Sequence, residues 1–175
     1  MGWKNVKEHY RIGHIVHVRE GKICIGSAYI SDLIAIGFDG IVKKYENFRN
    51  DDLERYALEM SADHKTLMEL IRSPDKFDKS ISVYTYDGGE IIEKQCEALG
   101  WPNVTHDGCL MYEDQFSADK KVVVEHARRN ARAGIELITE SIEEIERQLT
   151  DKRKKLHKII SELKKLESDY PESVG

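Results

Sequence analysis

The sequence predicts an α+β protein, in which a small antiparallel-sheet domain with short helices is followed by a long C-terminal coiled-coil helix. Short segments rich in β-branched residues, separated by turn residues, fill the first part of the chain. An apolar heptad repeat without proline fills the second part. We therefore expect an α+β globular domain over residues 1–117, a long oligomerising helix over 118–170 and a loose tail over 171–175.

The heptad repeat is the strongest pattern in the chain. Between residues 131 and 166, two apolar series recur every seven positions for about five repeats, interrupted by Lys152. At ~1.5 Å per residue the whole helix is roughly 75 Å long, which is too long to be buried against a small domain. A second copy of the chain is the simplest partner. The residues expected to form this homo-oligomer interface are Ile135, Ile138, Ile142, Ile145, Leu149, Leu156, Ile159, Leu163 and Leu166.

Charge also varies along this helix, because its first half is acidic and its second half is basic. The asymmetry suits the macrodipole of a solvated helix. It also suits an antiparallel pair of helices that crosses near Leu149, with Lys152 restricting the register. The number of chains and their direction stay open. The residues concerned are Glu136, Glu140, Glu143, Glu144 and Glu146, then Lys152, Arg153, Lys154, Lys155 and Lys158.

Composition excludes several classes of protein. Of the 175 residues, 40% are hydrophobic and 34% are charged, and the apolar runs fall far below the roughly 18 residues of a membrane span. The first residues lack the apolar core of a signal peptide. Cys24, Cys96 and Cys109 are too few and too scattered for a disulfide framework. We expect a cytoplasmic protein with no membrane partner.

The net charge of −5 is unevenly distributed. Residues 1–117 contain 14 Lys and Arg against 20 Asp and Glu, a net charge of −6. Residues 118–175 contain 13 against 12, a net charge of +1. An acidic globular domain argues against extended nucleic acid as a partner. It permits a small anionic ligand held by a few local cations or backbone N–H groups.

The predicted sheet is a four-stranded antiparallel meander. Residues 14–18 and 23–26 read as one hairpin with a glycine-containing turn. Residues 33–36 and 41–45 flank an Asp-Gly turn that begins at Asp39, so they read as a second hairpin. Strands at this spacing favour a sheet with one face packed on a core.

Short helical segments are expected before and after these strands in the sequence. Residues 3–11 read as a helical turn or an irregular segment. Asn50 and Asp63 are suitable caps for two helices, the second of which ends before a proline. Residues 81–86 alternate between apolar and polar side chains and therefore predict a strand.

The segment before the long helix combines a helix and a strand. We predict a helix from residue 90 to 99, because Gly100 and Pro102 stand where a helix stop places them. Residues 109–112 predict a strand, and Ser117 predicts the N-cap of the long helix.

The histidines and cysteines do not predict a metal site. His14 and His17 are three positions apart, and so are His106 and Cys109. In a strand, residues at this spacing point to opposite faces. The sequence contains neither a Cys-x-x-Cys nor a His-Glu-x-x-His motif. We expect no metal and no cofactor, and we interpret the remaining cysteines as buried small residues.

Residues 101–108 form the most site-like loop. They offer an aromatic face, an amide, a hydroxyl, an imidazole and a carboxylate within eight positions. Turn formation and packing are the commoner explanation of the same residues. A hydrolase acting on a phosphodiester would use His106 and Asp107 here. Neighbours in sequence do not orient each other as a catalytic dyad does, and no third member is identifiable.

Residues 3–11 form a basic and aromatic exception to the acidic domain. Lys4, Lys7 and Arg11 stand close to Trp3 and Tyr10. A nucleotide requires cations for its phosphate and an aromatic face for its base. We expect this segment and the 101–108 loop to bind such a ligand together. The candidate ligand-binding residues are Trp3, Lys4, His9, Tyr10, Arg11, Trp101, Asn103, Thr105 and His106.

Three segments carry a family resemblance: residues 3–16 (WKNVKEHYRIGHIV), 83–89 (VYTYDGG) and 100–108 (GWPNVTHDG). In them the chain resembles a group of uncharacterised bacteriophage and prophage accessory proteins, across most of residues 3–117. The resemblance brings no fold or activity with it. It implies the cytoplasm of a bacterial host, where small phage proteins often counter defence by blocking a host protein or sequestering a nucleotide signal.

The expected function is therefore non-enzymatic binding by a homo-oligomeric, anti-defence accessory protein. Its partner is a nucleotide-type immune signal or a host defence protein. One alternative is a hydrolase centred on His106 and Asp107. A second alternative is a structural or regulatory coiled-coil adaptor without a small-molecule site.

Overall fold

The structure is a computed structural model that describes residues 1–27, 29–45 and 50–170. It confirms the predicted α+β class, with small antiparallel sheets, short helices and one long C-terminal helix. The chain divides into two compact units, residues 1–127 and 128–175. The loose tail predicted for residues 171–175 lies outside the described residues.

The first sheet is the predicted meander, with its strands in chain order and all pairs antiparallel. The β1–β2 turn places Glu20 and Gly21 at φ values of 50° and 70°, which matches the tight hairpin turn whose twist suits the strands. Register aligns Val16 with Ile25 and Ile25 with Ile34, so one face of the sheet is continuously apolar and buried. The strands are β1 (Ile15–Arg19), β2 (Lys22–Gly26), β3 (Ile34–Ile36) and β4 (Val42–Lys44).

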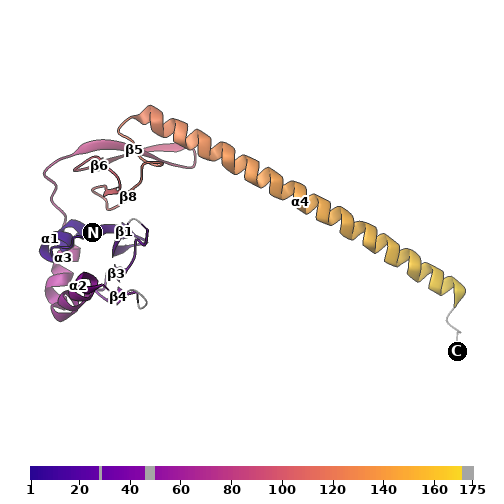
Figure 1. The fold of residues 1–175 in the computed structure, drawn as a ribbon, viewed down its shortest axis with the longest axis horizontal. Helices are drawn as coiled ribbons and strands as arrows, with labels where there is room; N and C mark the ends of the chain where they lie inside the picture. The colour runs from indigo at the N-terminus through magenta and orange to yellow at the C-terminus, as the bar shows by residue number, and fades with distance from the viewer. Residues whose placement is uncertain (28, 46–49, 171–175) are drawn as a thin grey trace. The chain divides into compact units, whose positions relative to one another are not determined.

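Three short helices cover the buried face of this sheet (Figure 1). The two predicted caps are confirmed: Asn50 Oδ1 accepts from Leu53 N at 3.1 Å, and Asp63 Oδ1 accepts from Thr66 N at 3.0 Å. Such caps satisfy backbone donors that have no partner within the helix. The helices are α1 (Trp3–His9), α2 (Asp51–Ala62) and α3 (His64–Arg72).

The prediction of a helix over residues 90–99 is wrong. Residues Glu90–Cys96 form strand β6, which pairs along its whole length with β5 (Ile81–Asp87). Gly88, at φ 53°, supplies the positive angle that a tight hairpin turn needs. Cross-strand pairing therefore overrides a moderate helix propensity. Gly100 lies after this strand and a bend. Its φ of 135° is outside the left-handed helical region that a residue ending a helix adopts.

A smaller sheet and the start of the long helix complete the first unit. The strand predicted at residues 109–112 is present as β8 (Leu110–Met111), paired with β7 (Asn103–Val104). Helix α4 spans Lys120–Asp169. Its cap is Asp119, whose carboxylate accepts from Lys121 N at 2.8 Å. Ser117 is not the cap, because its hydroxyl accepts from Asp119 N, which precedes the first residue of the helix.

Candidate functional site

A cleft of about 380 Å³ lies beside α1, between this helix and the chain segments that lead into and out of the β5–β6 hairpin. One side is formed by α1 and its C-terminal end, through Lys4, Lys7 and Arg11. Phe77 and the 103–106 segment contribute from the other side. Segments 3–11 and 101–108, almost a hundred positions apart in sequence, therefore meet in space.

The indole of Trp3 fixes this meeting. Trp3 Nε1 donates to His106 O at 3.1 Å, and the side chain is buried. The loop is held to the first sheet as well, because Val18 N donates to Gly108 O at 2.7 Å. Gly108 has φ 86°, and a Cβ there would lie 2.3 Å from Val18 Cγ2. Only glycine therefore allows the loop to approach β1 this closely.

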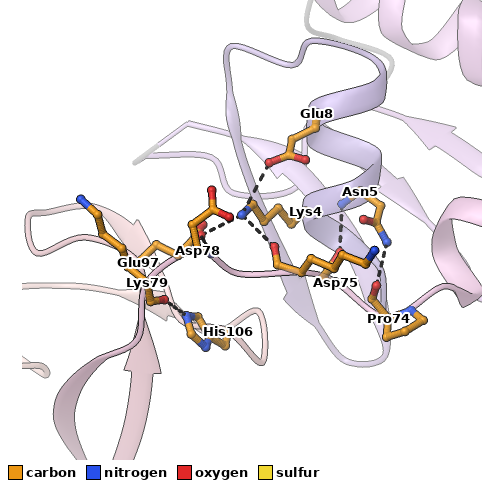
Figure 2. Close-up of polar contacts among 10 residues, drawn as sticks. Lys4, Asn5, Glu8, Pro74, Asp75, Asp78, Lys79, Glu97 and His106 are labelled. Carbon is orange, nitrogen blue, oxygen red and sulfur yellow. Dashed lines mark hydrogen bonds and ion pairs between the residues drawn. The ribbon is translucent and has the colours of Figure 1, made fainter.

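Two stacked rings form an aromatic wall of the cleft. The rings of Phe77 and His106 are 3.8 Å apart between centroids and 7° from parallel. His106 Nε2 lies 3.0 Å from Lys79 O (Figure 2). A carbonyl only accepts hydrogen bonds, so Nε2 carries a proton and the orientation of the imidazole is fixed. His106 is thus held at two points, at its carbonyl by Trp3 and at its ring by Lys79.

The ammonium of Lys4 is fully engaged by the protein (Figure 2). Nζ donates to Glu97 Oε1 and to Lys76 O, both at 2.8 Å, and Glu8 lies 3.6 Å away. Burial lowers the pKa of Lys4, but the hydrogen bond and charge of Glu97 outweigh it and raise that pKa overall. Lys4 therefore joins α1 to the start and end of the β5–β6 hairpin and has little capacity left for a ligand.

The N-terminal end of α1 is held by a partly buried carboxylate. Asp75 Oδ1 accepts from Asn5 N at 2.9 Å (Figure 2), and Asn5 Nδ2 donates to Ser73 O at 3.1 Å. Burial raises the pKa of Asp75 despite the hydrogen bond from the backbone of Asn5, which lowers it. The contact satisfies α1 where no capping side chain from Gly2 is available.

Lys7 and Arg11 are the cations that this site leaves available. Among the described residues, neither side chain has a hydrogen-bond or ion-pair partner. Arg11 terminates α1 with φ 50°, and Ile12 N closes the helix by donating to Lys7 O at 2.9 Å. A left-handed residue at this place is usually glycine. An arginine held there is a strained residue beside a cleft, which is a frequent property of functional positions.

The structure brings some of the predicted ligand-binding residues to the cleft and leaves others out. Trp3, Lys4, Arg11, Asn103 and His106 line it. Asn103 Nδ2 donates to Ala98 O, and Asn103 Oδ1 accepts from Val104 N, so this side chain shapes the loop.

The remaining predicted residues do not line this cleft. Tyr10 is buried in the core, and its hydroxyl has no partner among the described residues. His9 contacts Tyr10 edge-on. Thr105 is fully buried and holds the loop, because its Oγ1 accepts from Cys109 N at 3.0 Å. Trp101 is 39% exposed and lies outside the cleft lining.

Three residues that the cleft uses are absent from the list of candidate ligand-binding residues. Lys7 was recognised as a local cation, since Lys4, Lys7 and Arg11 recur at helical spacing on one face, but it was left out of that list. Phe77 lies in an irregular segment, where no periodicity marks it. Glu97 was assigned to a helix that does not form.

His106 and Asp107 are not paired with each other. Asp107 accepts from Lys94 Nζ and from Thr105 Oγ1, whereas His106 is bonded to Lys79 O. Burial raises the pKa of Asp107, but the bonds from Lys94 and Thr105 outweigh it and lower that pKa overall. The contacts therefore give a structural role to each residue and no acid–base dyad.

In the described parts of the chain, no group of three or more His, Cys, Asp or Glu side chains is arranged to hold a metal ion. None of the described helices combines the length and the hydropathy of a membrane span.

Comparison of this chain with family models, with curated proteins and with solved structures found no match.

Proposed function

We propose that this protein is a non-enzymatic binding protein, which takes a small anionic ligand of the nucleotide type into the cleft beside α1 and self-associates through α4. The observation that supports it is a pair of cations, Lys7 and Arg11, whose side chains have no polar partner among the described residues, at a cleft that also contains the Phe77–His106 wall. Cations and aromatic faces together are what a nucleotide requires.

The charges around the cleft favour one orientation of such a ligand. Glu8 and Glu97 flank Lys4, and the two carboxylates leave a net negative charge at that part of the cleft. A phosphate is therefore expected at the Lys7 and Arg11 end, and a base beside the aromatic wall. Stacking on an aromatic side chain is worth ~1–3 kcal/mol per base. The cleft volume of about 380 Å³ lies at the lower end of the range for small-molecule sites, which suits a mononucleotide better than a longer chain.

Thermal unfolding with a panel of linear and cyclic nucleotides tests this proposal. A ligand at a hundred times its Kd stabilises the folded state by about 2.7 kcal/mol. We expect that stabilisation for the wild type and its loss in Lys7→Ala and Arg11→Ala. Lys65→Ala is the matched control, because Lys65 is an exposed cation on α3 outside the cleft lining. It should respond as the wild type does.

Two outcomes would contradict the proposal. Absence of any nucleotide-dependent shift would favour a host protein as the partner of this surface. Conversion of a bound nucleotide to product, followed by chromatography, would favour the hydrolase. Recovery of an unchanged nucleotide would support sequestration.

The biological setting of this proposal is counter-defence in a bacterial cytoplasm during phage infection. It rests on the resemblance of residues 3–16, 83–89 and 100–108 to phage accessory proteins. A protein that binds an immune nucleotide without consuming it acts by stoichiometry. It must therefore be present in excess over the signal to be effective.

A further inference from the structure

Helix α4 leaves its apolar seam uncovered. The nine residues of the seam between Ile135 and Leu166 are each 47–66% exposed. We propose that a second copy of this chain covers this seam, in antiparallel direction, with the twofold axis between Thr150 and Asp151. The inference rests on the self-association in the proposed function and adds the direction, the number of chains and the register.

The apolar positions support this register. In an antiparallel coiled coil, the two heptad core series face each other, so residue numbers in one layer have a constant sum. With the axis between Thr150 and Asp151, apolar residues meet in every layer of the seam except the central ones. The layers pair Ile135 with the partner's Leu166, Ile138 with Leu163, Ile142 with Ile159, Ile145 with Leu156, and Leu149 with Lys152.

Lys152 distinguishes the two directions. In a parallel dimer in register, Lys152 would face its own copy within one core layer, which places two ammonium groups together in a dry seam. In the antiparallel arrangement it faces the partner's Leu149, so its methylene stem can pack there. The partner's Glu146 then lies within one turn of its ammonium.

The charges that flank the seam point the same way. Antiparallel pairing places Arg132 beside the partner's Glu167, and Glu146 beside the partner's Arg153. Twofold symmetry makes each of these pairs occur twice. Parallel pairing brings no opposite charges together at these positions and places Glu162 beside the partner's Glu167. The opposite charges therefore select the antiparallel direction.

The same charges also select one register. A shift of the pairing by one heptad in one direction places Glu146 beside the partner's Glu146. A shift in the other direction places Arg153 beside the partner's Arg153. Both shifts also shorten the overlap of the apolar seam. The arrangement centred between Thr150 and Asp151 is the one in which both the seam and the flanking charges are complementary.

Charge reversal tests the register. Glu146→Lys or Arg153→Glu alone should weaken the dimer on the order of tenfold, because attractive pairs become repulsive ones. The double variant should restore the wild-type Kd, measured by sedimentation equilibrium. Glu140→Lys carries the same charge change on the helix face opposite the seam and should leave the Kd unchanged. A double variant as weak as the single ones would overturn the register.

Cysteine cross-linking tests the direction in the full-length protein. Ile145→Cys and Leu156→Cys chains should form a disulfide when mixed, because these positions share an antiparallel layer. Neither should cross-link to itself through the new cysteine, as peptide mapping would show. Self-linking of Ile145→Cys would establish a parallel coil and overturn this inference while leaving self-association intact. A trimer or tetramer would overturn it too, and a wild-type monomer at micromolar concentration would also remove the self-association. Nucleotide binding is measured separately in each case.

Discussion

Replacing Arg11 with glycine should stabilise the fold and abolish ligand binding at the same time. Arg11 holds φ 50° at the end of α1, and the left-handed region costs a residue with a Cβ ~1–2 kcal/mol. Glycine avoids that cost, but its freer unfolded chain costs ~0.5–1 kcal/mol. The expected net gain in the free energy of unfolding is about 0.5–1 kcal/mol. The closing bond from Ile12 N to Lys7 O needs no side chain at residue 11 and should persist.

Urea unfolding at one fixed protein concentration measures this gain. Arg11→Ala is the matched variant, because it removes the guanidinium but keeps the Cβ. Both variants should lose the nucleotide-dependent stabilisation, and only Arg11→Gly should gain stability. Glu20→Gly adds a control, since Glu20 also has φ 50° but lies in the β1–β2 turn, outside the cleft lining. If Arg11→Gly proves no more stable than Arg11→Ala, the helix does not end in the strained conformation described here.

Three further predictions concern the stability of the fold. Gly108→Ala should destabilise the fold by at least about 2 kcal/mol in urea unfolding, because its Cβ would lie 2.3 Å from Val18 and φ is positive. The pKa of Asp107 is lowered, so its stabilising contact with Lys94 is fully present above the usual value of 3.8. That stabilisation is lost as the pH falls through the folded-state pKa. Asp107→Asn should therefore flatten the fall in stability between about pH 5 and 2. Asn50→Ala should cost about 1 kcal/mol by calorimetry through loss of the α2 cap, with no effect on the cleft.

Local patterns in the sequence predicted most of the first sheet and its helices. Asn50 and Asp63 could be identified as caps because the bond of a cap reaches only three residues along the chain. The hairpin turns likewise depend on residues such as Gly21 that need positive φ. The prediction of a helix over residues 90–99 was wrong because this segment pairs with β5. That strand precedes it in the sequence and imposes the extended conformation.

The candidate site was predictable in its chemistry and less so in its membership. Segments 3–11 and 101–108 were selected for their residue types, and the bond from Trp3 to His106 O joins them. Phe77 and Glu97 were not selected, because their places in the cleft follow from tertiary contacts over long sequence separations. Lys4 was predicted to bind the ligand for the same reason, since only the folded chain shows that Glu97 neutralises its charge.

The burial of Trp3 gives the cleft an intrinsic spectroscopic probe. The chain contains two tryptophans, Trp3 at 6% exposure and Trp101 at 39%. An indole buried against Phe77 emits at shorter wavelength and is shielded from iodide, whereas an exposed one is readily quenched. In Trp101→Phe, the remaining emission therefore reports on the cleft wall alone. Occupancy of the cleft can then be followed as a fluorescence titration, at protein concentrations too low for calorimetry and without a label.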